Sequence, residues 1–283
     1  MLLDVVRSLP ALLHRGLPMA GACLALALFP QAARAQDAPK LIMPLPQTLH
    51  PWQVPPPHAA AEAYFVNLRS GDKIETPYLL KFGLSGGWGL APISAPTGGK
   101  SGHHHLLINR DLPLDFKQPL PFNDQYIHFG KGQMETVLNL APGTYTLRLL
   151  LADDKHLPHF VYSKPVSVTV LKQNPGDPAA LVRKGVQVLV PAGTAKTPFR
   201  VQFHASGLSV GHLAQKQKDT GHFRLTLVPQ GKGTEAVMEF VNGQTEVWLS
   251  PPAGEYQLKL DLLDNTNVSR TLAPTATASI RVP

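Results

Sequence analysis

The sequence is almost without cysteine. Its one cysteine, Cys23, lies in an apolar run near the N-terminus of the 283 residues. Once that run is removed as described below, the chain has no thiol at all. This excludes a disulfide scaffold and thiolate metal ligands, so the mature protein must be stabilised by ordinary hydrophobic cores.

No apolar stretch reaches the roughly 20 residues needed to cross a bilayer. The longest, residues 17–29, follows two arginines and precedes Ala33-Arg34-Ala35. A basic start, a short apolar run and a small-x-small site are typical of a secretory signal peptide. We expect residues 1–35 to be cleaved after Ala35, leaving a periplasmic or secreted protein with no transmembrane segment in the mature chain.

Runs of one charge are also missing. The formal charge of +7 falls to +5 once the signal's three basic residues and one acidic residue are removed, and the surplus is scattered along the chain. Together with export, this argues against a nucleic-acid partner. Mild basicity fits an anionic envelope environment better.

Helical periodicity is absent over any stretch of ten residues or more. Short runs rich in β-branched and aromatic residues alternate instead with Gly, Pro, Asn and Asp, as in residues 145–151, 166–171 and 256–262. This spacing predicts an all-β protein of two tandem immunoglobulin-like β-sandwiches. The expected boundaries are a signal peptide at 1–35, a Pro-rich linker acting as a semi-rigid tether at 36–60, sandwiches at 61–172 and 182–283, and a short linker at 173–181.

The two expected sandwiches are copies of one another. Thr76-Pro77 recurs as Thr197-Pro198 and Gly132-Gln133 as Gly243-Gln244, and between residues 128 and 159 the offset is a constant 111. The second copy keeps this scaffold, including His222 at the position of His103, but not the histidine cluster, so the cluster is not needed for the fold. At the aligned positions, His105, His128, His156 and His159 of the first copy stand opposite Arg224, Glu239, Asn267 and Arg270.

Strand alternation separates the three consecutive histidines. His104 shares a face with Leu106 and aligns with Phe223, an apolar core position of the second copy. We therefore expect His104 to be buried in the core. His103 and His105 point to the other face, where a His-x-His pair can chelate a metal.

Three further histidines come from elsewhere in the first copy. His128 precedes a glycine turn, while His156 and His159 flank a segment stiffened by Pro158. The connection at residues 109–125 is eight residues longer than its counterpart in the second copy. Extra loop length beside extra histidines is typical of a site added to an existing scaffold.

Imidazole suits zinc, copper, nickel and iron, and without thiolates we rank copper(II) and zinc first. Alternatively, the histidines hydrogen-bond an anionic ligand or line a polar groove. Glu135 and Asp153 recur as Glu246 and Asp264, so we expect them to be structural. The candidate ligands are His103, His105, His128, His156 and His159, of which His156 or His159 would complete the site. His104, Asp154 and Met134 are further candidates.

Three spaced motifs carry a family resemblance. They are Gly102 to Ile108 with its three histidines, Ile127-His128-Phe129-Gly130, and His156-x-Pro-His159. Over roughly residues 62–171 the chain resembles the bacterial family called domain of unknown function 4399. The resemblance implies an exported or envelope-associated domain without an established activity, and it places His104 in the motif with its neighbours. The second copy has the fold's pattern without these motifs.

The sequence favours a non-catalytic periplasmic protein that holds copper or zinc in the first sandwich. Two G-x-S-x-G matches, at Gly83 and Gly207, lack the helix that a nucleophile elbow requires, and no general base stands out. The alternative is an envelope adhesion or assembly module that binds protein or polysaccharide, with structural histidines. Convergence of the histidines in space would favour metal, and their dispersal would favour the module.

Overall fold

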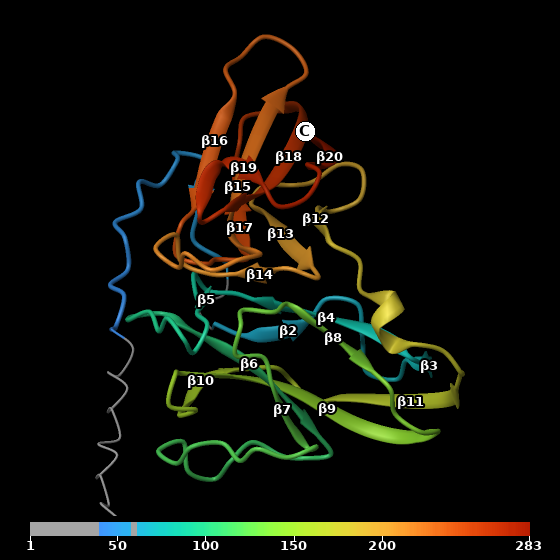
Figure 1. Cartoon of the computed structure of the whole chain (residues 1–283). Coiled ribbons are helices and arrows are strands. Elements are labelled where there is room, and N and C mark those ends of the chain that lie inside the picture. Colours follow the sequence, from blue (N-terminus) through green and yellow to red (C-terminus); the bar gives the residue numbers. More distant parts are fainter. Residues whose placement is uncertain (1–39, 58–60) are drawn as a thin grey trace, which may run out of the picture. The chain divides into compact units, whose positions relative to one another are not determined.

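The computed structural model describes residues 40–57 and 61–283 (Figure 1). The expected signal peptide lies outside these residues. Among the residues described, no helix is long and apolar enough to cross a membrane. Apart from one 3₁₀ turn, η1 (Pro178–Leu181), their regular structure is β-strand. The prediction of an all-β chain of tandem sandwiches is confirmed.

The first sandwich packs a seven-stranded sheet against a three-stranded one. The large sheet has the order β3-β11-β9-β6-β5, with β7 paired to β6 and β10 to β9, and the small sheet has the order β2-β4-β8. The candidate histidines lie on strands β6, β7 and β10 of the large sheet and, for His156, in the turn between β9 and β10. The strands are β2 (Ala63–Phe65), β3 (Lys73–Thr76), β4 (Tyr78–Leu84), β5 (Gly89–Leu90), β6 (Ser101–Ile108), β7 (Tyr126–His128), β8 (Glu135–Leu138), β9 (Gly143–Ala152), β10 (Pro158–Tyr162) and β11 (Val166–Gln173).

The second sandwich repeats this topology. Its larger sheet has the order β14-β15-β18-β19, with β16 beside β15 and β20 beside β18, and the other sheet has the order β1-β17-β13-β12. Strand β15 lies between β16 and β18 as β6 lies between β7 and β9. The strands are β12 (Gly185–Leu189), β13 (Phe199–Ser206), β14 (Ser209–Val210), β15 (Thr220–Pro229), β16 (Ala236–Phe240), β17 (Glu246–Leu249), β18 (Gly254–Asp264), β19 (Asn267–Thr271) and β20 (Ala276–Val282).

Strand β6 is buried on both faces along its whole length. On the inner face, Leu106 belongs to the main core of the first sandwich. On the outer face, Leu107 packs with Leu120 and Leu150 in a small second core. Leu120 lies in the long 109–125 connection, which therefore covers the outer face of the sheet where His103 and His105 point.

The Pro-rich segment lies against both sandwiches over residues 40–57, where we had expected a tether. Ile42 pairs with Thr97 of the first sandwich in an isolated bridge. Further along, β1 (Gln53–Val54) pairs antiparallel with β17 of the second sandwich. Extended, proline-rich backbone can still offer its remaining N–H and C=O groups to a sheet edge, which is what β1 does.

Two glycine turns join the sandwiches reciprocally. The N–H of Val210 donates to the carbonyl of Gly132 at 2.9 Å, and the N–H of Leu90 donates to the carbonyl of Gly243 at 2.9 Å. Both glycines have positive φ, +82° and +78°. A Cβ on Gly132 would lie 2.1 Å from the carbonyl oxygen of Val210, so both conformation and space require glycine there.

A buried carboxylate completes the contact between the sandwiches. Glu135 of β8 accepts hydrogen bonds from His204 Nε2 at 2.9 Å, Ser206 Oγ at 2.7 Å and the N–H of Gly207 at 3.0 Å. Burial alone would raise the pKa of Glu135, but these hydrogen bonds outweigh it and hold the pKa below its usual range. Glu135 is thus structural, as the repeat predicts.

We expect Glu135→Ala to lower the free energy of unfolding by about 3 kcal/mol, because three donors of the second sandwich lose their acceptor. Denaturant unfolding measures this, with Glu255→Ala on an exposed strand position as the control. Since the folded-state pKa of Glu135 is depressed, its contribution is present above about pH 4.5 and is lost as the pH falls further. A cost equal to that of Glu255→Ala, unchanged by pH, would contradict this role.

Candidate metal centre

Four imidazoles converge on the outer face of the large sheet in the first sandwich. The nearest ring nitrogens of His103 and His105, both Nε2, lie 2.9 Å apart. Nε2 of His156 lies 3.3 Å from Nδ1 of His128. One nitrogen from each of the four rings fits within a mutual distance of 4.8 Å. The structure therefore brings together four of the five histidines expected as main ligands.

Strand pairing explains how three of these rings meet. His103 and His105 are two residues apart on β6 and so share a face. His105 is paired directly with His128 of β7 across the sheet. Cross-strand partners hold their side chains side by side, so the sheet itself sets the spacing of these imidazoles.

The fourth ring comes from the turn between β9 and β10. His156 has a left-handed backbone, with φ of +63°, which is uncommon for a residue other than glycine. Its N–H donates to the carbonyl of Asp153, and the Asp153 side chain accepts from the N–H groups of Lys155 and Leu157 at 2.8 Å. Asp153 thus shapes the turn, as its recurrence in the second copy predicts.

The four rings are held in their neutral form. Burial is the main cause that lowers the pKa of His103 to about 2 and the pKa of His105 to about 3, and repulsion from the neighbouring imidazoles adds to it. Burial also lowers the pKa values of His128 and His156, although nearby aspartates oppose this at His156. Neutral imidazole is the form that binds a metal ion, so no proton has to be displaced at neutral pH from rings held in this state.

Two residues at the cluster are absent from the sequence-based candidates. Gly130 leaves space for His128, because a Cβ there would lie 2.7 Å from Cε1 of that ring. The aligned residue of the second copy is Val241, a contrast that could have pointed to Gly130. Phe122 packs edge-on against His156 and His128, with ring centroids 4.5 and 5.1 Å apart. It lies in the inserted connection, so alignment with the second copy could not identify it.

His104 lies on the opposite face, as strand alternation predicts. Its ring packs against Phe82, 5.5 Å between centroids, and neither ring nitrogen has a hydrogen-bond partner. Burial lowers the pKa of His104 to about 3. His104 is therefore a core residue that is kept neutral, and it does not join the four.

The remaining candidates lie elsewhere. His159 packs against Trp88, 4.8 Å between ring centroids. Met134 is fully buried in the apolar cluster that contains the core of the second sandwich. Asp154 lines a small hollow with Asp153, Thr97 and Ser101. None of these three belongs to the group of four.

The second sandwich shows what the same positions hold without histidine. Arg224 is paired with Glu239 in the register that His105 and His128 occupy, and the two form an ion pair. Their side chains are 35% and 40% exposed, whereas His105 is fully buried. A charged pair at a partly exposed sheet position is replaced in the first sandwich by neutral donors under a covering loop.

The donor set fits a transition-metal ion. Four nitrogens around zinc, at about 2.0–2.1 Å from it, lie roughly 3.3–3.4 Å from one another. The separations of 2.9 and 3.3 Å are close to this value, and the wider ones, at up to 4.8 Å, would have to shorten around a bound ion. Four protein ligands would leave zinc no open position, which is the arrangement of non-catalytic sites.

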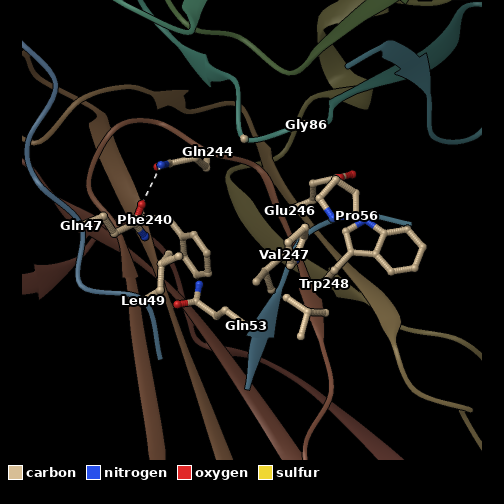
Figure 2. Close-up of a pocket in the computed structure, with 13 residues that line it drawn as sticks. Gln47, Leu49, Gln53, Pro56, Gly86, Phe240, Gln244, Glu246, Val247 and Trp248 are labelled. Atoms are coloured by element: carbon tan, nitrogen blue, oxygen red, sulfur yellow. Dashed lines mark hydrogen bonds between the residues drawn. The ribbon is translucent and has the colours of Figure 1, made fainter. Parts of the chain in front are cut away.

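A separate cavity of about 210 Å³ lies beside the N-terminal segment and β17 (Figure 2). Its polar side chains already have partners: Gln244 donates to Gln47 at 2.8 Å, and Glu246 accepts from Tyr64 at 2.9 Å. What remains is mainly apolar, with Trp248 at one side. None of the candidate histidines lines this cavity, so the two features are distinct.

Comparison with protein families gives a clear match. The family model described as "Domain of unknown function (DUF4399)" matches residues 80–171 and 201–283. The chain belongs to this family. The match to the second region establishes the repeat: both sandwiches carry the DUF4399 pattern, although the histidine motifs are found only in the first.

Other comparisons describe similarity alone. No curated protein matches the chain. Among solved structures, the chain is similar to the fibronectin(III)-like modules of CbhA from Clostridium thermocellum, with 10% identity over 78% of this chain and 92% of that one, at a TM-score of 0.25. It is also similar to a segment of two fibronectin type III domains from chicken tenascin, with 12% identity over 78% and 97%, at a TM-score of 0.23.

We expect His104→Leu to raise the free energy of unfolding by about 1 kcal/mol at neutral pH, because it removes a buried polar ring without partners while nearly conserving volume. Denaturant unfolding checks this. The His222→Leu variant is the control, and we expect it to lose stability because His222 Nδ1 is hydrogen-bonded to Asn265 at 2.7 Å. Equal losses in both variants would show that His104 has a partner in solution.

Proposed function

We propose that this protein is an exported, periplasmic metal-binding protein that holds copper or zinc without catalysing a reaction. The ligands are His103, His105, His128 and His156. The observation that carries the proposal is the convergence of four ring nitrogens within 4.8 Å. Dispersed histidines would have favoured the adhesion module instead.

The chemistry of the cluster supports a metal rather than an anion. Burial keeps the imidazoles neutral, so they offer lone pairs and do not offer positive charge. Borderline nitrogen donors favour copper(II) and zinc over magnesium or calcium, which prefer oxygen. The repeat adds an internal comparison, since the scaffold of the second sandwich forms with an ion pair in place of two of the ligands.

Export is supported by the sequence of residues 1–35, which has the features of a signal peptide. Copper and zinc sites without cysteine suit an oxidising compartment, where thiolates would be converted to disulfides. With all four positions filled by protein, the site would buffer or deliver a metal ion. A hydrolytic zinc site would need a free position for water.

The decisive experiment is metal titration of the untagged protein. We expect the wild type to bind one copper(II) or zinc ion, and the His103→Ala/His105→Ala double variant to lose that binding. His156→Asn introduces the residue of the second copy, and asparagine tolerates the left-handed backbone at this position. This variant should lower metal affinity by more than the roughly 10–100-fold typical of losing a residue that only orients a ligand. Elemental analysis and isothermal titration calorimetry measure both.

His159→Asn is the matched control, because His159 packs on Trp88 outside the cluster and the substitution is the same. The metal affinity of the His159→Asn variant should equal that of the wild type. Absence of stoichiometric binding in the wild type, or binding that persists in the double variant, would overturn the proposal.

Gly130 gives an independent test that changes no ligand. An added Cβ would meet the ring of His128 and the side chain of Ile93, at 2.7 and 2.5 Å, and would push the imidazole away from the others. We expect Gly130→Ala to weaken metal affinity by about tenfold, like the loss of a group that orients a ligand. Gly185→Ala, where the new Cβ meets nothing closer than 3.8 Å, is the control.

In a His128→Ala background, Gly130→Ala should have no further effect on affinity. An effect of the same size in both backgrounds would show that Gly130 acts through the fold and not through His128.

A further inference from the structure

The histidine cluster is open on one side only. His103 and His105 have no exposed surface, because they lie on the buried strand β6 and the 109–125 connection covers this face of the sheet. His128 and His156 are partly exposed. The cluster therefore meets solvent at these two outer rings.

Phe122 stands at that opening. Its ring packs edge-on against both outer imidazoles, at 4.5 Å from His156 and 5.1 Å from His128 between centroids. The residue is nevertheless 65% exposed, so one side of its ring meets the histidines and the other meets water. The ring lies over the two imidazoles of the cluster that are partly exposed to solvent.

The backbone on each side of Phe122 is fixed. The N–H of Leu120 donates to the carbonyl of His156 at 2.9 Å, and the Leu120 side chain is buried in the small outer core. After Phe122, Asn123 forms a turn in which its carbonyl accepts from the N–H of Tyr126 at 3.1 Å. The phenylalanine ring can thus turn about its own side-chain bonds while the loop stays in place, a motion that is fast compared with loop opening.

We infer that Phe122 is the residue that controls exchange of the metal ion, admitting a bare or partly hydrated ion and excluding bulky metal chelates. This inference rests on the proposed function. With the ring in place, an ion bound by the inner pair cannot leave without displacing it. Phe122 acts on the rates of binding and release and contributes no ligand atom.

The test compares Phe122→Ala with Phe116→Ala. Phe116 lies in the same connection but stacks on Phe160, 4.5 Å between centroids, and has no ring contact with the cluster. Zinc-loaded protein is mixed with an excess of a chromophoric chelator and the release rate is followed by stopped flow. Loss of the aromatic contacts should speed release by about tenfold in Phe122→Ala, with uptake accelerated as well. Phe116→Ala should match the wild type.

A metal-free measurement separates this inference from the proposed function. Diethyl pyrocarbonate modifies neutral imidazoles that reagent can reach, and mass spectrometry locates the products. In the apo protein, Phe122→Ala should speed modification of His128 and His156 severalfold, whereas Phe116→Ala should not. Phe122→Ser also removes the ring and serves if the alanine variant fails to fold.

The outcomes are distinct. If the wild type binds no metal, the proposed function is overturned and the control of exchange falls with it, while the modification rates still report whether Phe122 shields the rings. If the wild type binds zinc but Phe122→Ala and Phe116→Ala release it equally fast, the inference about Phe122 is wrong and the proposed function stands.

Discussion

The reciprocal contact of the two glycine turns constrains the rest of this structure. Each turn gives its carbonyl to a strand of the other sandwich, and at Gly132 there is no room for a side chain. The turn at Gly132 begins directly after β7, which carries His128. The second sandwich lacks the histidine cluster, but its Val210 is hydrogen-bonded to the segment that follows His128. The second sandwich therefore supports the strand end that carries His128.

Covering one face of a sheet changes which side chains that face can hold. In the second sandwich, Arg224 and Glu239 keep part of their hydration and their charges. In the first, the longer connection removes water from the same register, and an ion pair there would lose much of its solvation. Neutral imidazoles avoid that cost. The insertion and the histidines are thus physically linked, because the loop that buries the position also selects uncharged donors for it.

Much of this arrangement could be predicted from the sequence. Alternation along β6 separated His104 from its two neighbours, and the repeat identified Glu135 and Asp153 as structural residues. The choice between His156 and His159 could not be predicted, because it depends on a left-handed backbone at His156 that no periodicity encodes. The pairing of β1 with β17 could not be predicted either, because only two residues of the proline-rich segment are paired and two residues show no strand pattern. The contact of Phe122 with the cluster could not be predicted, because it depends on the path of the inserted part of the 109–125 connection, which has no counterpart in the second copy.

Strand β1 has a consequence for how the protein responds to force. The segment that enters from the N-terminus is hydrogen-bonded first to the loop at Thr97 and then to the edge strand β17 of the second sandwich. Tension applied to the N-terminus, for example through attachment to a surface, would act first on these hydrogen bonds and on Trp52, which packs against the second core, and only later on the histidine sheet. The segment would detach first and lengthen the connection, so the histidine sheet would come under tension only once the released segment was fully extended.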